Sequence, residues 1–279
     1  MDLKNGVLSF GKMTPNKPRQ KKHTPSTMQA DALFTFTTKL EYLMGYLELS
    51  YISPRYYIED IKYLRIPKLK KIAYPMKCFC DINLHKLDVH IEWYGNYGLA
   101  FSKEWGMNKG IQPIQYINLE SELRKSFTTA FSLALKTDTS KESKAQIKME
   151  NFLLHEMMYF KPYSGIMKNR TTGKNEVKCF TDECEWRYIS DVTIAGFEQV
   201  HYDNAYLNED VLNYFNGLMA EVPEIALSFN YEDIKYIIVK SNIEFRVLTE
   251  KIVSLNLGET EKYQLMSKIV VWDNSRGDF

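Results

Sequence analysis

This sequence has few cysteines and few histidines. The four cysteines among its 279 residues are Cys78, Cys80, Cys179 and Cys184, and the five histidines are scattered. The cysteines of each pair are separated by one and by four residues, spacings that do not match those of zinc-binding fingers. We therefore expect no metal site.

Long apolar runs are also absent. No stretch approaches the roughly eighteen apolar residues of a membrane span, and the lysine-rich start lacks the apolar core of a signal peptide. The formal net charge of +1 argues against a uniformly basic nucleic-acid-binding coat, although it allows a local basic patch. We expect a cytoplasmic protein with no membrane partner.

Common phosphate-binding and hydrolase motifs are missing too. The sequence contains neither Gly-x-x-x-x-Gly-Lys-Ser/Thr nor Gly-x-Gly-x-x-Gly, the two frequent phosphate-binding loops. It also lacks the Gly-x-Ser-x-Gly elbow of many hydrolases. A nuclease is disfavoured because no Asp, Glu and Lys residues have metal-site spacing.

Aromatic residues are abundant, at 14% of the chain with 19 tyrosines. Two interpretations stay open, because a tyrosine-rich core and an aromatic face for a ligand, base or partner have the same composition. The apolar content of 44% is ordinary, and the length allows one large core or two small ones.

The composition divides the chain into two parts. Residues 1–30 are rich in Lys, Pro, Thr and Asn, which predicts a disordered basic arm. This arm is either a solvated tail or a docking segment for a partner or for nucleic-acid phosphates. Residues 31–279 are predicted to form a single α+β domain with a helical insertion, a hairpin, at about 118–158.

Apolar periodicity supplies the expected elements. Strict alternation over 87–94 predicts a half-buried strand. We expect Thr38 to cap a helix, Pro54 and Arg55 to lie in an exposed turn, and residues 167–178 to form a polar loop. The other expected strands are 33–37, 73–80, 99–102, 114–117, 185–190 and 233–239, and the other expected helices are 40–47, 103–107, 211–218 and 245–255. This loose mixture favours an α+β fold over a doubly wound one.

One group of candidate site residues surrounds a glycine-flanked strand. Gly95 and Gly98 allow close backbone approach, and Phe101-Ser102 ends the strand, which suits a flat aromatic ligand. Tyr94 could stack on such a ring or belong to the core. Arg55 is a candidate phosphate ligand, because its guanidinium matches phosphate geometry, or a solvated loop residue.

A second group is Glu183-x-Glu185-Trp186-Arg187. In a strand, alternate residues share a face, so Glu183, Glu185 and Arg187 should point together and Trp186 away. Two carboxylates so close need a cation or ligand beside them. The alternatives are a surface salt-bridge ladder and a catalytic carboxylate that stabilises an oxocarbenium ion or binds a ribose hydroxyl.

Several of these motifs resemble a known family. The segments 33–37, 40–47, 53–56, 75–81, 94–105, 161–163 and 183–188 are similar to those of the AbiG-type abortive-infection proteins of bacteria. The resemblance extends from about residue 31 to 250, and the 94–105 motif is its most specific part. It implies a role in phage defence, as part of a toxin–antitoxin operon.

A more distant resemblance is to ADP-ribosyltransferase toxins, which implies a fold of split mixed sheets and NAD as co-substrate. By position, Thr35 and Thr37 would bind the cofactor from the first strand, although Thr35 replaces the usual His or Arg. Phe101 and Ser102 would form the second motif. The resemblance implies that Glu185, paired with Glu183, is catalytic.

The resemblance also implies roles for Tyr94, which with Ser102 would hold the nicotinamide ribose, and for Arg55 at the pyrophosphate. The leading prediction is therefore a toxin that transfers ADP-ribose from NAD to a nucleic acid, with RNA favoured, or to a protein. Its expected partners are an antitoxin and a chaperone. The alternative is a non-catalytic antitoxin or regulatory protein that binds a toxin.

Overall fold

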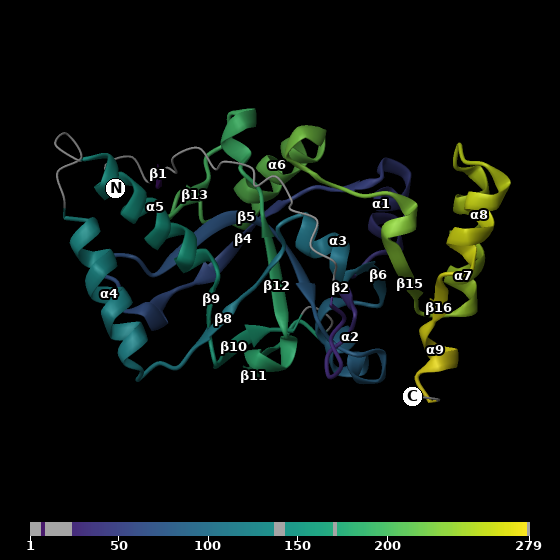
Figure 1. The fold of residues 1–279 in the computed structure, drawn as a ribbon, viewed down its shortest axis with the longest axis horizontal. Coiled ribbons are helices and arrows are strands. Elements are labelled where there is room, and N and C mark those ends of the chain that lie inside the picture. Colours follow the sequence, from purple (N-terminus) through teal and green to yellow (C-terminus); the bar gives the residue numbers. More distant parts are fainter. Residues whose placement is uncertain (1–6, 9–23, 137–142, 170–171, 278–279) are drawn as a thin grey trace.

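The structure is a computed structural model that describes residues 7–8, 24–136, 143–169 and 172–277. It has a mixed α+β fold, as predicted (Figure 1). The predicted basic arm, residues 1–30, lies largely outside the described residues, and the division of the chain into an arm and one domain stays a prediction. In the described ranges, no helix is long and apolar enough to cross a membrane.

Most strands belong to one large sheet. Its main path runs β1-β13-β5-β2-β6-β15-β16, and three further strands, β4, β7 and β12, branch from it. The neighbours along it are antiparallel except β15 and β16. The bounds are β1 Val7–Leu8, β2 Ala32–Thr37, β4 Arg55–Asp60, β5 Lys71–Cys80, β6 Tyr97–Ser102, β7 Gln112–Pro113, β12 Glu185–Ile189, β13 Val200–His201, β15 Ile234–Val239 and β16 Ile269–Val271.

Three pairs of short strands lie outside this sheet. They are β3 (Tyr51–Ile52) with β14 (Leu227–Ser228), β8 (Gln115–Ile117) with β9 (Phe160–Pro162), and β10 (Ser164–Lys168) with β11 (Asn175–Cys179). The main strands are therefore joined in one sheet, and the predicted split into two sheets of the ADP-ribosyltransferase type is not what the described residues form. The long strand β5 makes the difference, because it pairs with β2, β4, β12 and β13.

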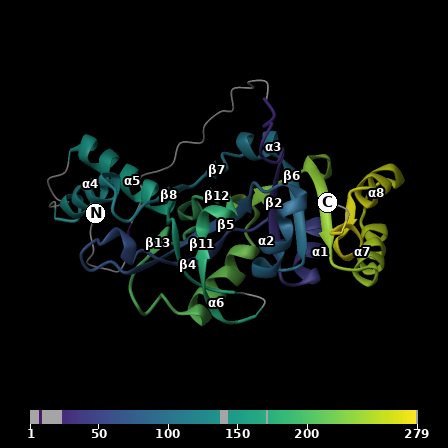
Figure 2. The same ribbon diagram turned by 90° about the horizontal axis from the view of Figure 1, so that it is seen from below.

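Helices gather at both ends of the sheet (Figures 1 and 2). At one end lie α4 (Glu122–Ala134) and α5 (Lys144–Met158), the two helices expected from the apolar spacing in this part of the chain. At the other end lie α7 (Asn242–Ser254), α8 (Glu259–Met266) and the short α9 (Trp272–Ser275). The remaining helices are α1 (Leu40–Leu49), α2 (Leu87–Tyr94), α3 (Lys103–Asn108) and α6 (Glu209–Ala220).

The helices cover both faces of the sheet, so its central strands are buried on both sides. In β2, Leu33 packs in one core cluster with Leu47 of α1 and Leu248 of α7, whereas Phe34 packs in another with Ile91 of α2. A third cluster, around Phe131 and Leu154, joins α4 and α5 to β5. A strand covered on both faces does not need polar residues at alternate positions.

The predicted strand at 87–94 is wrong, because these residues form helix α2. Leu87 and Ile91, four residues apart, are buried on its inner face, whereas Val89 is 60% exposed. Apolar residues at every second position include this i, i+4 pair, so the alternation fitted both structures. The helix ends at Gly95, whose φ of +113° favours glycine.

Other local predictions also need correction. Thr38 does not cap α1, since the N-cap is Lys39 and makes no side-chain capping bond. The expected turn at Pro54 and Arg55 leads into strand β4, and the expected loop at 167–178 contains most of the hairpin β10–β11. The chain does not close with the predicted helix at 245–255, because α8, β16 and α9 follow it.

Candidate functional site

A cavity of about 670 Å³ lies over one part of the large sheet. Its floor comes from β2, β4 and β5, and its walls come from α2, β9 and β10. Aromatic side chains line much of it, among them Phe34, Phe36, Tyr57, Tyr94 and Phe180. The volume is in the range of small-ligand pockets.

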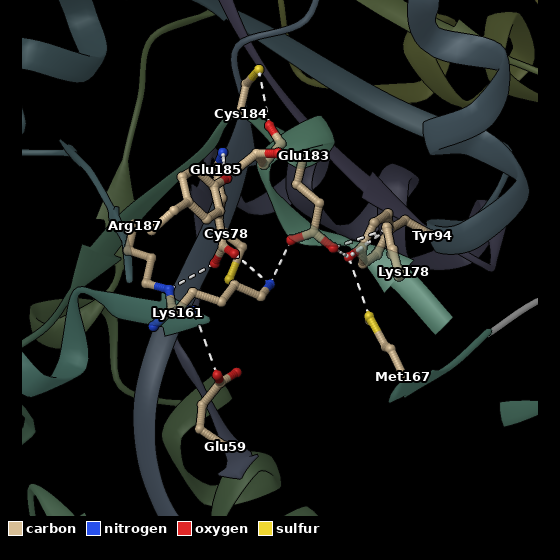
Figure 3. A network of polar contacts seen from close by, with 12 residues as sticks. Glu59, Cys78, Tyr94, Lys161, Met167, Lys178, Glu183, Cys184, Glu185 and Arg187 are labelled. Atoms are coloured by element: carbon tan, nitrogen blue, oxygen red, sulfur yellow. Dashed lines mark hydrogen bonds and ion pairs between the residues drawn. The ribbon is translucent and has the colours of Figure 1, made fainter. Parts of the chain in front are cut away.

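A buried ammonium group lies between two carboxylates at the base of this cavity (Figure 3). The Nζ atom of Lys161 is 2.5 Å from Oε2 of Glu183 and 2.6 Å from Oε2 of Glu185. All three residues are buried. Strand β9 explains the position of Lys161, because Phe160 before it is buried in the α4–α5 core and the alternation directs Lys161 to the other side.

Arg187 neutralises the second oxygen of Glu185. Its Nε atom donates to Oε1 of Glu185 at 2.7 Å, and Nη1 donates to the Tyr74 hydroxyl and to the Met158 carbonyl oxygen. Its Nη2 atom lies 3.5 Å from a carboxylate oxygen of Glu59. Arg187 has no exposed surface, so every contact it makes is within the protein.

Glu183 has a second set of partners on the side of α2. Its Oε1 atom accepts a hydrogen bond from the Tyr94 hydroxyl and lies 2.9 Å from Nζ of Lys178. The Lys178 ammonium is also 4.4 Å from the centre of the Trp93 ring, a distance typical of a cation–π contact. Figure 3 shows Glu183 between Lys161 on one side and Tyr94 with Lys178 on the other.

Opposite charges balance within this network. Glu59, Glu183 and Glu185 supply three carboxylates, and Lys161, Lys178 and Arg187 supply three cations. A buried charge is tolerated when it is paired and hydrogen-bonded, and each charged group here has an opposite charge nearby. We call these six residues the buried ion network.

The pairing sets the protonation of its members. Burial alone would raise the pKa of Glu185, but the charges of Arg187 and Lys161 hold it far below its usual range. Burial alone would lower the pKa of Lys161, yet Glu185 and Glu183 raise it well above its ordinary value. For Lys178, burial outweighs Glu183 and lowers the pKa.

This arrangement suits a structural role better than a catalytic one. A general base functions best with a pKa near the working pH, whereas Glu185 is held ionised by two cations. Its two oxygens already bind Arg187 and Lys161, so neither is free to face a developing positive charge. Burial also raises the pKa of the Cys78 thiol, which makes it a poor nucleophile.

Four of the eight predicted site residues line the cavity. They are Thr35, Tyr94, Glu183 and Glu185. Glu185 and Arg187 share one face of β12, as predicted, whereas Glu183 lies before the strand in a short 3₁₀ helix, Phe180–Glu183. Trp186 is not part of the buried ion network.

The other four predicted residues lie elsewhere. Phe101 is in the core and stacks on Trp105 with 4.3 Å between ring centres, and Ser102 caps α3 by accepting from the Trp105 amide. Arg55 is exposed and donates to Oδ1 of Asn213 at 3.1 Å. Thr37 ends β2 opposite Tyr97 of β6 and is not among the residues that line the cavity.

Sequence reasoning missed three members of the network: Glu59, Lys161 and Lys178. The sequence held one signal for Lys161. This lysine lies between Phe160 and Pro162 in an otherwise apolar stretch, where a single charged residue is unusual and indicates a specific partner. Nothing in the sequence indicates that Lys178 folds back on Glu183. In the described residues, no cluster of His, Cys, Asp and Glu could hold a metal ion.

Two comparisons relate this chain to known proteins. A family model described as "Putative abortive phage resistance protein AbiGi, antitoxin" matches residues 50–240. A relative from Lactococcus lactis subsp. cremoris, named "Abortive phage resistance protein AbiGi", is 36% identical over 245 residues, which cover 81% of this chain and 98% of the relative. The chain belongs to the AbiGi family of abortive phage resistance proteins. The resemblance to AbiG-type proteins is thereby confirmed.

The family description corrects the leading functional prediction. It names an antitoxin, so the prediction of an ADP-ribosyltransferase is wrong. The predicted NAD co-substrate is not tested by these comparisons, and they give no support to a nucleic-acid acceptor or to a chaperone partner. No solved structure matches this chain, so no structural neighbour supports the ADP-ribosyltransferase fold.

Proposed function

We propose that this protein is the antitoxin of an abortive-infection system and that it neutralises a toxin by binding it, without catalysis. The description of the family model supports the antitoxin role. It also implies a partner, because an antitoxin acts on a toxin.

The absence of catalysis is proposed because both carboxylate oxygens of Glu185 already have partners. Its carboxylate is the strongest candidate for a catalytic group, yet Arg187 and Lys161 bind its two oxygens at 2.7 and 2.6 Å. A catalytic carboxylate has to direct at least one oxygen toward the reacting atoms. Glu185 directs both toward fixed cations, which stabilise the fold at the base of the cavity.

Growth assays in bacteria test this proposal. The protein expressed alone should leave growth unchanged, whereas the toxin encoded beside it should arrest growth. Co-expression should restore growth, and the two proteins should purify together. Growth arrest by this protein alone, or failure to restore growth when it is expressed as a folded protein, would contradict the antitoxin role.

A further inference from the structure

One edge of strand β5 is only partly paired. β12 pairs with residues 76–80 along the opposite edge. On the edge in question, β4 pairs with residues 71–76, and β2 pairs at Cys80 through Phe34. In the described part of the chain, residues 77–79 therefore have no strand partner on this edge, over about 10 Å.

The direction of the backbone groups follows from the neighbouring pairs. The amide of Asp81 donates to the carbonyl oxygen of Cys184, toward the β12 side. Backbone groups alternate between the two edges along a strand, so the N–H and C=O of Cys78 point to the other edge. In β2, one edge is paired with β6, and Phe34 on the other edge pairs with Cys80 of β5. Phe36 lies two residues after Phe34, so its backbone N–H and C=O also point to the β5 side, into the same gap.

The gap opens into the cavity. Residues Phe34–Phe36 of β2 and Met76–Phe79 of β5 all contribute to its lining. Aromatic rings lie nearby, including Tyr57 and Phe180. The buried ion network at the base has equal numbers of carboxylates and cations. Two exposed lysines, Lys71 and Lys168, also line the cavity, and neither forms an ion pair within the described residues.

These features match an extended polypeptide better than a compact ligand. An unpaired strand edge presents a donor and an acceptor at the spacing of another strand, and added strands are a common mode of peptide recognition. The aromatic lining suits an apolar side chain of that segment. The unpaired lysines complement acidic residues beside it.

We infer that an extended segment of the toxin pairs with the free backbone of Cys78 and Phe36 and inserts an apolar side chain into the cavity. Acidic residues of the same segment lie beside Lys71 and Lys168. This inference rests on the proposed function, because it names the site through which the antitoxin holds its partner.

Hydrogen exchange of the complex tests the inference. The full chain is measured alone and with the co-purified toxin, and exchange is followed in peptides that cover residues 33–37 and 72–80. We expect the amides of Cys78 and Phe36 to exchange at least about tenfold more slowly in the complex. A complex that forms without any change at these amides overturns this inference and leaves the proposed function intact. Absence of any complex overturns both.

A proline substitution provides a second test. Cys78→Pro removes the N–H that faces the gap but no ladder bond of the folded protein, and the same strand already contains Pro75. The matched control Cys78→Ala keeps the amide. Cys78→Pro should weaken toxin binding about fivefold, the effect of one lost hydrogen bond, and Cys78→Ala less than about twofold.

Equal binding by folded Cys78→Pro and by the wild type would overturn the inference. Circular dichroism and thermal melting establish whether each variant is folded. If Cys78→Pro does not fold, the exchange experiment on the wild-type complex decides the matter by itself.

Discussion

Substitution of Glu185 by Gln distinguishes a structural from a catalytic carboxylate. The side chain is buried and holds Arg187 and Lys161 at 2.7 and 2.6 Å. In Glu185→Gln, the amide oxygen can still accept from Arg187, but the amide NH₂ would face the Lys161 ammonium, donor against donor. The substitution also leaves one net positive charge buried in a network that was balanced.

The size of the effect follows from the burial. Breaking a buried ion pair by removing one charged partner costs about 3–5 kcal/mol. For a protein of this size, each kcal/mol lowers Tm by about 2–4 °C, so Glu185→Gln should lower Tm by about 6–20 °C. Differential scanning calorimetry measures this shift.

An exposed pair provides the matched control. Glu120 lies 3.2 Å from Arg65, and its side chain is 74% exposed. Glu120→Gln should cost less than about 1 kcal/mol, since exposed ion pairs are weak. An unchanged or raised Tm in Glu185→Gln would refute the structural account, because relief of strain on removing a charge is typical of a functional carboxylate.

Two further predictions concern pH and backbone strain. The pKa of Glu185 is below its ordinary value of 4.5 when folded, so its stabilisation should be complete above that pH and decrease as pH falls below it. Because the pKa of Lys161 is raised above 10.5, its stabilisation should decrease as pH rises beyond that value. A Tm that stays constant at both low and high pH would contradict these two expectations. Gly95→Ala should cost more than about 1 kcal/mol, because φ is +113° and the new Cβ would lie 2.4 Å from the Thr37 carbonyl oxygen. Gly217→Ala, inside α6 with no atom within 4 Å, should gain about 0.5–1 kcal/mol. Urea denaturation measures the free energy of unfolding of both variants. Equal changes in the two would contradict the account that Gly95 occupies a strained backbone conformation.

The sequence supported part of the fold because some patterns have one physical solution. The largely apolar stretch at 73–80 predicts a strand, and it became part of β5, which is buried along most of its length. The spacing of Phe127 and Phe131 fits one face of a helix, which became α4. At 87–94 the pattern fitted two structures, and packing of Leu87 and Ile91 against the core selected the helix.

The candidate site was predictable only within one segment. Glu185 and Arg187 share a face because β12 alternates, and this could be read from their spacing. Lys161 lies 22 and 24 residues before Glu183 and Glu185, and no local pattern indicates that β9 would bring it between them. Contacts between distant segments depend on strand pairing and packing, which spacing alone does not determine.

The most direct test of the proposed function is a binding measurement with purified components. Isothermal titration calorimetry of this protein with its toxin, in buffer without NAD or any other nucleotide, should give a saturable complex at a fixed stoichiometry. In a parallel assay, co-expression of the same two genes in bacteria should restore growth. Restored growth without a detectable complex would contradict neutralisation by binding and would point to an enzymatic antitoxin.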